Sequence, residues 1–266
     1  MKNEQSLDTL CAALSYAMGI EAPACANAAS ERITSYIDEK LGGKKVDRIL
    51  MYNPDAVAEW IYNKYPEYLK EVREYGELEV PFATVMPSVT PVCFGTMYTG
   101  AQPAVHGIMK YEKPVIKIDT FFDALIRAGK KPVILSQTNC SMSMIYRERD
   151  MDYYIFDTIA ETNAKAAELI IEDKHDVIIV YNTNYDAVMH KNGPEAPITL
   201  AELRANSQAY GVLTNLVKER WAHHDTLVGF AMDHGCHEID GDLGSHGLDM
   251  DEDINIRHLY TVYPKK

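Results

Sequence analysis

Residues 176–194 read DVIIVYNTNYDAVMHKNGP, and this stretch decides the class of fold. The apolar run at 176–182 predicts a buried strand. Asp186 and His190 follow four residues apart, so a helical turn would place both side chains on one face. The Asn-Gly-Pro sequence at 192–194 would end that turn. A buried strand that leads into a helix is typical of a parallel α/β sheet.

The same alternation extends over most of the chain. Short apolar runs predict further buried strands, and helical patterns lie between most of these runs. The runs are 48–53, 81–86, 132–137 and 226–232, and the helical patterns are 56–65, 120–129, 158–172 and 199–222. In the last of these, Thr199 and Glu202 have the spacing of a capping box. The sequence therefore predicts a three-layer α/β/α fold with a mostly parallel central sheet.

No internal repeat, low-complexity tract or linker interrupts this pattern. We therefore expect a single domain over residues 1–266. Residues 1–45 are Ala-rich and helical in character, and Gly42 and Gly43 predict the end of this N-terminal extension. The extension is expected to pack either on the domain's own sheet or on a second subunit, so a homo-oligomer is one possibility.

The charge balance limits the class of partner. The chain has 39 acidic and 26 basic side chains, a net charge of −13. A long nucleic acid or an anionic membrane surface requires clustered positive charge, so we expect neither as a partner. A small phosphorylated substrate remains compatible, because bound cations can invert the field around a site.

The five cysteines show no CxxC pair and no regular spacing. Reduced thiols in the cytosol are the simplest interpretation. The N-terminus lacks the features of a signal peptide, and no apolar stretch approaches 18 residues. These observations predict a cytoplasmic protein.

Residues that follow the predicted strands carry the main functional signal. In open parallel sheets, ligands bind beyond the carboxyl ends of the strands. Four such ends are followed by a metal-ligating side chain or a hydroxyl, namely Asp55, Thr90, the pair Asp186 and His190, and the pair Asp233 and His234. Taken alone, Asp186 and His190 are weak evidence for a metal site, since a surface carboxylate and a solvated imidazole would give the same spacing.

Glycines accompany the other candidate ligands. Asp233 and His234 are followed by Gly235, where the backbone can approach an ion closely. The alternative is a turn that happens to contain both residues. Downstream, His246 lies in the sequence Gly-Ser-His-Gly, which favours a ligand in a tight loop over a packing role.

Thr90 has two interpretations. Pro91 fits the first position of a helix, which would place Thr90 at or beside the N-cap. Alternatively, Thr90 is a nucleophile beside a helix N-terminus, where free N–H groups favour a phosphate. A threonine hydroxyl needs a base or a metal ion to become reactive. Ser88 is a competing hydroxyl two residues earlier.

These motifs, in this order, resemble the alkaline phosphatase superfamily, and most closely its type I phosphodiesterase/nucleotide pyrophosphatase branch. The resemblance covers most of residues 46–266. It comprises Asp55, Thr90 ahead of Thr99-Gly100, the segment from Pro103 to Ile108, Asp186-x3-His190, Asp233-His234-Gly235 and the His246 loop. Each piece is weak alone, but the ordered set is specific.

The resemblance implies a site with two metal ions. One would be held by Asp186, His190 and His246, and the other by Asp55, Asp233, His234 and the Thr90 oxygen. Zinc suits these ligands best, with manganese or iron as alternatives. Thr90 would attack phosphorus to form a phosphothreonine intermediate, which water would then hydrolyse.

The chain departs from the family pattern in three ways. Asp55 lies in Asn-Pro-Asp-Ala, where the family usually has Asp-Gly. Lys110 and Tyr111 occupy the region where the pyrophosphatases have a phosphate-binding Asn. We treat both as substrate-binding candidates, although Lys110 could equally be a surface lysine. The chain is also short for this superfamily, which leaves little room for a cap domain or for the insertion found in its mutases.

The leading hypothesis is a metal-dependent phosphodiesterase or nucleotide pyrophosphatase that acts on a small soluble ester. A phosphomonoesterase that uses the same site is the alternative among enzymes, and the positive charge of Lys110 would favour it. A non-catalytic metal-binding scaffold is the alternative outside enzymes. The remaining histidines have structural interpretations: His106 would hydrogen-bond locally, and His223 and His224 would end the long helix, where their charge suits its dipole.

Overall fold

The computed structural model describes residues 1–266 and contains a central eight-stranded sheet. The strand order is β1-β3-β10-β7-β2-β6-β4-β5. Only β10 is antiparallel to its neighbours; all the other pairs are parallel. The strands are β1 (Gln5–Ser6), β2 (Arg48–Pro54), β3 (Leu78–Ala83), β4 (Pro132–Gln137), β5 (Asp152–Phe156), β6 (Val177–Asn182), β7 (Thr226–Phe230) and β10 (Asn255–Tyr263). The predicted mostly parallel α/β fold is confirmed.

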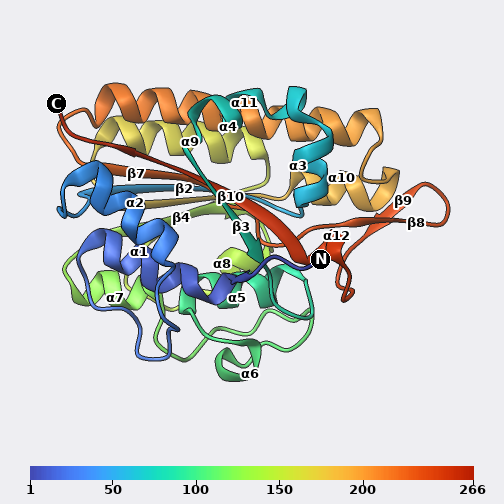
Figure 1. Ribbon diagram of the computed structural model, residues 1–266, viewed down its shortest axis with the longest axis horizontal. Helices are drawn as coiled ribbons and strands as arrows, with labels where there is room; N and C mark the ends of the chain where they lie inside the picture. The colour runs from blue at the N-terminus through green and yellow to red at the C-terminus, as the bar shows by residue number, and fades with distance from the viewer.

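Helices cover both faces of this sheet (Figure 1). One face carries α3 (Glu59–Lys64), α4 (Lys70–Tyr75), α9 (Ile159–Glu172), α10 (Asn184–Asn192) and α11 (Pro197–Arg220). The other carries α1 (Leu10–Met18), α5 (Thr90–Thr99), α7 (Phe121–Arg127) and α8 (Ser141–Ile145). The remaining elements are α2 (Glu31–Leu41), α6 (Pro103–His106), α12 (Asp251–Ile254), the 3-10 turns at Leu7–Thr9 and Pro66–Leu69, and a hairpin of β8 (His237–Ile239) and β9 (Leu243–Ser245).

The predicted apolar runs all become strands, although β3 begins and ends three residues before its run. No predicted run corresponds to β1, β5 or β10 of this sheet. β5 is an edge strand with no fully buried residue, so its sequence lacks a strong apolar run. β10 mixes Arg257 and His258 with apolar residues, so its sequence lacks a continuous apolar run; it runs antiparallel to β3 and β7.

The predicted capping box at Thr199 is wrong. Helix α11 begins earlier, at Pro197, and the Thr199 hydroxyl donates to the Gly193 carbonyl at 2.8 Å. Capping boxes occur instead at α7, with Thr120 and Asp123, and at α9, with Thr158 and Glu161. Pro197 moves the start of α11, because its fixed φ and missing N–H suit the first helical turn.

The N-terminal segment forms α1 and α2, which end at the left-handed residues Gly19 and Gly42. Leu10 and Leu14 of α1 are fully buried, and the helix packs against α5 and α7 of the same chain. The apolar core therefore runs without interruption from α1 to β10. None of the helices combines the length and the apolar character that crossing a bilayer requires.

We expect Thr158→Ala to lower the free energy of unfolding by about 1 kcal/mol, because it removes an N-cap side chain. In the structure, Thr158 Oγ1 accepts from the Glu161 N–H at 3.2 Å. Thr34→Ala is the matched control, since Thr34 lies inside α2, where alanine has the higher helix propensity. Urea denaturation measures both variants, and equal midpoints for the two would contradict the assignment of this cap.

Candidate active site

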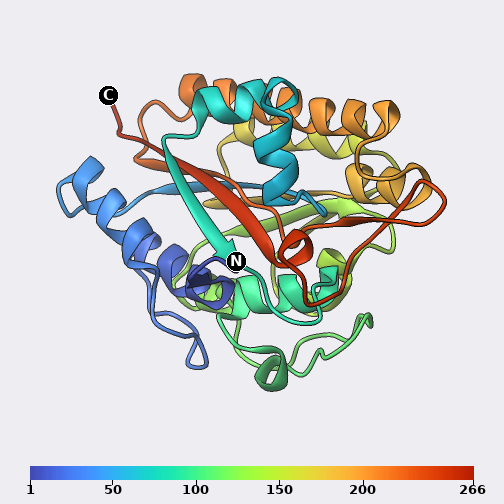
Figure 2. The ribbon, with the colours of Figure 1, turned by 45° about the vertical axis from the view of Figure 1, so that its right-hand side comes forward.

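The candidate residues gather at the carboxyl edge of the sheet. Neighbouring strands β7, β2 and β6 end there, and β3 leads into α5 at the same edge. The β8–β9 hairpin extends beyond this edge next to α10 (Figure 2). Because parallel strands end on the same side, residues far apart in the chain meet there. These residues are Asp55 after β2, Thr90 at the start of α5, Asp186 and His190 in α10, Asp233 and His234 after β7, and His246 after β9.

Asp186, His190 and His246 form the first cluster. Asp186 Oδ1 lies 3.2 Å from His190 Nε2 and 3.4 Å from His246 Nε2. The two Nε2 atoms are 3.2 Å apart. The spacing of four residues in α10 places Asp186 and His190 on one face, as predicted, and the hairpin delivers His246 to it.

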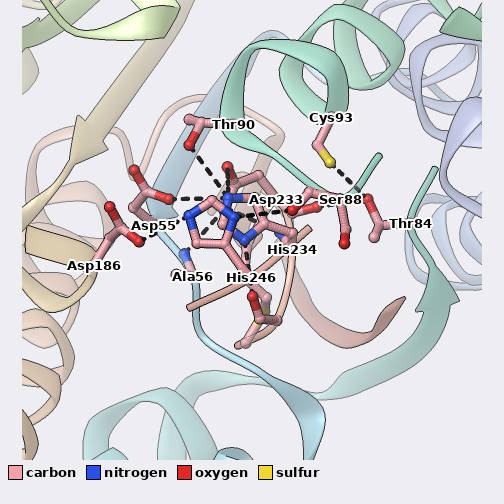
Figure 3. Close-up of polar contacts among 12 residues, drawn as sticks. Asp55, Ala56, Thr84, Ser88, Thr90, Cys93, Asp186, Asp233, His234 and His246 are labelled. Atoms are coloured by element: carbon pink, nitrogen blue, oxygen red, sulfur yellow. Dashed lines mark hydrogen bonds and ion pairs between the residues drawn. The ribbon is translucent and has the colours of Figure 1, made fainter. Parts of the chain in front are cut away.

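Asp55, Asp233 and His234 form the second cluster, and all three are buried. His234 Nε2 lies 3.4 Å from Asp55 Oδ1 and 3.3 Å from Asp233 Oδ2. Thr90 Oγ1 is 3.2 Å from the same nitrogen. The His234 and His246 rings, 4.1 Å apart, join the two clusters (Figure 3). The structure thus brings together the two ligand sets that the resemblance implies.

Backbone carbonyls orient the three imidazoles. The Nδ1 atoms of His190, His234 and His246 lie 3.0, 2.9 and 3.1 Å from the carbonyl oxygens of Gly244, Gly235 and Ser88. A carbonyl oxygen can only accept a hydrogen bond, so each Nδ1 carries the proton. In the neutral ring, each Nε2 then presents its lone pair to the site.

Hydrogen bonds also orient two of the carboxylates, in each case through one of the two oxygens. Asp233 Oδ1 accepts from the backbone N–H groups of Ala56 and His234, and Asp55 Oδ2 accepts from the Tyr181 hydroxyl. The other oxygen of each, together with Asp186 Oδ1, is buried without a hydrogen-bond donor. Buried acceptors without donors are costly, and lone pairs from nitrogen and oxygen converge on the same space. This donor set fits divalent cations that accept imidazole and carboxylate ligands.

The pKa values reflect this crowding of acceptors. Burial raises the pKa of Asp55 and Asp233 well above the usual carboxyl range, and repulsion by neighbouring carboxylates adds to the effect. Burial lowers the pKa of His234 to about 3, so this ring stays neutral. Burial also opposes ionisation of Asp186, but its attraction to the His190 and His246 imidazoles in their protonated form outweighs that effect and lowers its pKa. A bound cation would favour the ionised form of all three carboxyl groups.

Thr90 is the first residue of α5, and Val89 occupies the N-cap position. The prediction that Pro91 is the first helical residue is therefore wrong by one position. The Thr90 hydroxyl does not cap the helix; it is buried and faces His234. The competing Ser88 hydroxyl instead lies 3.5 Å from the Leu248 carbonyl.

Two glycines allow the close packing of the ligand loops. A Cβ at Gly244 would lie 2.8 Å from the Met189 carbonyl oxygen of α10, and one at Gly235 would lie 2.0 Å from the Glu252 carbonyl oxygen. Any side chain at either position would force the backbones apart. The carbonyls of Gly244 and Gly235 are also the acceptors for His190 and His234, so these glycines bring the acceptors within reach.

The substrate-binding candidates lie on an exposed loop. Lys110 is paired with Glu112 at 3.5 Å, and Tyr111 is 61% exposed. Neither makes a hydrogen bond or ion pair with the two clusters. His106 behaves as predicted: it is buried, its Nδ1 accepts from the Ile108 N–H, and its Nε2 lies 3.1 Å from the Thr96 hydroxyl.

Comparison with known proteins supports the resemblance inferred from the sequence. Residues 146–264 match the family model described as type I phosphodiesterase/nucleotide pyrophosphatase. The resemblance to that family is confirmed. The matched segment contains both α10 ligands, Asp233, His234 and His246, whereas Asp55 and Thr90 lie outside it. A search of curated proteins finds no match.

Solved structures share the fold. Human ectonucleotide pyrophosphatase/phosphodiesterase 5 aligns with a TM-score of 0.60 and 16% identity, over 73% of this chain and 58% of the human one. The murine protein aligns with a TM-score of 0.58 and 17% identity, over 73% and 58% of the two chains. An inactive variant of the murine protein, solved in complex with AMP, aligns with a TM-score of 0.58 and 16% identity, over 73% of this chain and 59% of the murine one. The chain thus spans less than two thirds of the length of these proteins.

Tyr181 is a site residue that the sequence analysis missed. It is the penultimate residue of β6, fully enclosed, and its ring packs edge-on against Phe94 of α5 at 4.8 Å. Its hydroxyl donates to Asp55 Oδ2, which leaves Asp55 Oδ1 directed at His234. The only signal in the sequence is that this tyrosine lies near the end of an apolar run. The sequence does not show that Tyr181 and Asp55, which lie on or just after neighbouring strands, are in contact.

We expect Tyr181→Phe to weaken metal binding at the Asp55 cluster by roughly 10–100-fold, because the Asp55 carboxylate loses the donor that orients it. Titration with zinc in competition with a chromogenic chelator measures this affinity. Tyr16→Phe is the matched control, since Tyr16 donates to the Asp38 carboxylate at 2.6 Å outside both clusters. Unchanged affinity in Tyr181→Phe would show that Tyr181 does not orient the ligand.

Proposed function

We propose that this protein is a metal-dependent hydrolase of phosphate diesters or pyrophosphates, with nucleotide-like substrates, and that Thr90 is its nucleophile. The observation that carries this proposal is the position of the Thr90 hydroxyl, 3.2 Å from His234 within a buried cluster of metal-ligating side chains. The family match and the shared fold support the choice of reaction. The murine variant crystallised with AMP is described as inactive after replacement of a threonine by alanine, which supports a threonine nucleophile and a nucleotide-like substrate.

Two divalent cations, preferably zinc, are part of the proposal. Asp186, His190 and His246 would hold one, and Asp55, Asp233, His234 and the Thr90 oxygen would hold the other. When bound, the ions would supply positive charge that stabilises the Thr90 alkoxide and the phosphate oxygens. The buried setting strengthens these electrostatic interactions, because little water is present to screen them.

The proposed reaction has two steps, formation of a phosphothreonine and its hydrolysis. Thr90 Oγ1 loses its proton to solvent and attacks phosphorus, so that the Oγ1–P bond forms and the bond to the leaving oxygen breaks. The leaving alcohol or nucleoside phosphate takes up a proton from solvent. A water molecule then attacks the phosphothreonine, which releases phosphate or a monoester and restores the hydroxyl. Backbone carbonyls and Tyr181 hold the surrounding ligands in place during both steps.

Two alternative functions, a phosphomonoesterase and a non-catalytic scaffold, would each require a specific observation. Lys110 would favour a phosphomonoester if its charge reached the outer phosphate oxygens, but in the structure it pairs with Glu112 on an exposed loop. A non-catalytic scaffold would be supported by a missing ligand or nucleophile. All seven expected positions carry a suitable side chain, so a hydrolase is the better proposal.

We expect the zinc- or manganese-loaded protein to hydrolyse an aryl phosphodiester, and Thr90→Ala to reduce kcat by at least 100-fold, because the nucleophile is lost. Ser88→Ala is the matched control: it removes the competing hydroxyl but keeps the carbonyl that orients His246. Stripping the metal should abolish turnover. Full diester activity in Thr90→Ala would eliminate the proposed nucleophile.

We expect Lys110→Ala to raise KM severalfold for an aryl phosphomonoester and to leave KM for the diester nearly unchanged. The monoester carries the larger negative charge, so it depends more on a nearby cation. Steady-state kinetics at low ionic strength, where screening is weak, give the clearest comparison. Lys117→Ala, which removes a lysine paired with Glu148, is the control. If both KM values stay at the wild-type level, Lys110 has no role in substrate binding.

A further inference from the structure

A second group of metal-ligating side chains lies at the opposite edge of the sheet. Asp173 ends α9 just before β6, and His223 and His224 lie between α11 and β7. Figure 1 shows α11 spanning the molecule from the side of α10 to the side of the C-terminus, and His223 and His224 follow its last residue in the chain. They therefore lie at the amino ends of the strands whose carboxyl ends carry the candidate active site. The strand length separates the two groups by roughly 20 Å.

Three potential ligand atoms of this group point at one another. Asp173 Oδ2 lies 3.1 Å from His223 Nε2 and 2.9 Å from His224 Nε2. The two imidazole rings are only 4.1 Å apart. Helix α11 ends at Arg220, and both histidines direct Nε2 at Asp173. The interpretation of these histidines as charges that suit the helix dipole therefore misses their main contact.

Arg48 orients one of the three ligands, and Asp47 lies near a second. Arg48 Nε donates to Asp173 Oδ1 at 3.0 Å and leaves Oδ2 free to face the imidazoles. Asp47 Oδ2 lies 3.9 Å from His224 Nδ1, so a carboxylate stands behind the ring on the side away from Asp173. A ligating histidine in a zinc site usually donates its other ring N–H to a carboxylate, and Asp47 lies just beyond hydrogen-bond distance for that role.

The backbone around the group is well anchored. Asp173 adopts a left-handed conformation with φ of 50° at the C-cap of α9, and its backbone N–H donates to the Leu169 carbonyl. Trp221 is buried, and its indole N–H donates to the Ile170 carbonyl of α9 at 2.9 Å. This bond ties the end of α11 to the end of α9, so the three ligands hold their relative positions without an ion.

The local charge favours a cation. Four carboxylates lie in this network, whereas Arg48 and Lys265 are the only basic side chains paired with it; the carboxylates are Asp47, Asp173, Asp176 and Asp225. His223 is 64% exposed on its side chain, so an ion can enter from solvent and water can complete its coordination. Two imidazole nitrogens and one carboxylate oxygen suit zinc and similar transition metals better than magnesium or calcium.

We propose that Asp173, His223 and His224 form a separate binding site for a divalent transition-metal ion such as zinc, distinct from the candidate active site. The ion would join the ends of α9 and α11 at the amino edge of the sheet. An ion bound only by the folded chain stabilises that chain, so the role of this site is structural. The proposal does not depend on the proposed hydrolase activity, because it uses none of the same residues.

The test compares zinc content in the full-length wild-type protein and in His224→Ala after dialysis against buffered zinc. We expect the variant to bind one equivalent less zinc than the wild type, whatever the occupancy of the catalytic clusters. His223→Ala, at the more exposed position, should lose the same equivalent and guards against misfolding of the first variant. Hydrolysis of the diester, where present, should be unchanged in both variants.

A crystal of the zinc-loaded protein provides a direct readout. We expect an anomalous peak at the zinc edge between Asp173 Oδ2 and the two Nε2 atoms. Equal zinc content in the wild type and both histidine variants, or a crystal with zinc only at the carboxyl edge, would overturn the proposal. Either result would leave Asp173 as a plain acceptor of two imidazole N–H groups. A crystal with zinc at Asp173, His223 and His224 but none in the candidate active site would count against the proposed hydrolase and would support this site.

Discussion

Repulsion among three carboxylates is the constraint on which the candidate active site depends. Asp55, Asp186 and Asp233 each direct one oxygen into the same space, and none of these oxygens has a hydrogen-bond donor. Burial of Asp55 and Asp233 makes their ionisation unfavourable in the protein alone, as their raised pKa values show. The fold holds this arrangement through Tyr181 and through backbone N–H groups that fix the opposite oxygens. A site built in this way is stable with Asp55 and Asp233 protonated or with cations bound.

The parallel sheet determines where these groups meet. Strands β7, β2 and β6 are adjacent, and each is followed by ligands at the carboxyl edge. The amino ends of the same three strands are adjacent to Arg48, Asp173 and His224. Every strand in a parallel sheet brings a loop to both edges, so a chain of this length can build a polar cluster at each end of one apolar layer. The candidate active site and the group at the amino edge lie at opposite ends of the same strands and have no side chain in common.

The comparisons and the geometry support different parts of the site. The family model covers residues 146–264, which include five of the seven candidate ligands. Asp55 and Thr90 lie outside that segment, and their membership of the site depends on their contacts with His234. The neighbouring solved structures are longer than this chain, so elements that recognise substrate in them need not have counterparts here. Lys110 and Tyr111, the candidates for substrate binding, lie on an exposed loop of the present chain.

The sequence by itself determined the order of strands β2, β3, β4, β6 and β7 and of the helices between them, the α/β class and the identity of the candidate ligands. Each of these is a local pattern: an apolar run, a spacing of four, a glycine beside a histidine. The sequence did not determine β10, the true start of α11 or the partner of Asp55. Those features depend on contacts between residues far apart in the chain, such as Tyr181 with Asp55 and His224 with Asp173. Only the tertiary structure decided which nitrogen of each histidine faces the site, because the acceptor for the other nitrogen is a backbone carbonyl that any residue could supply.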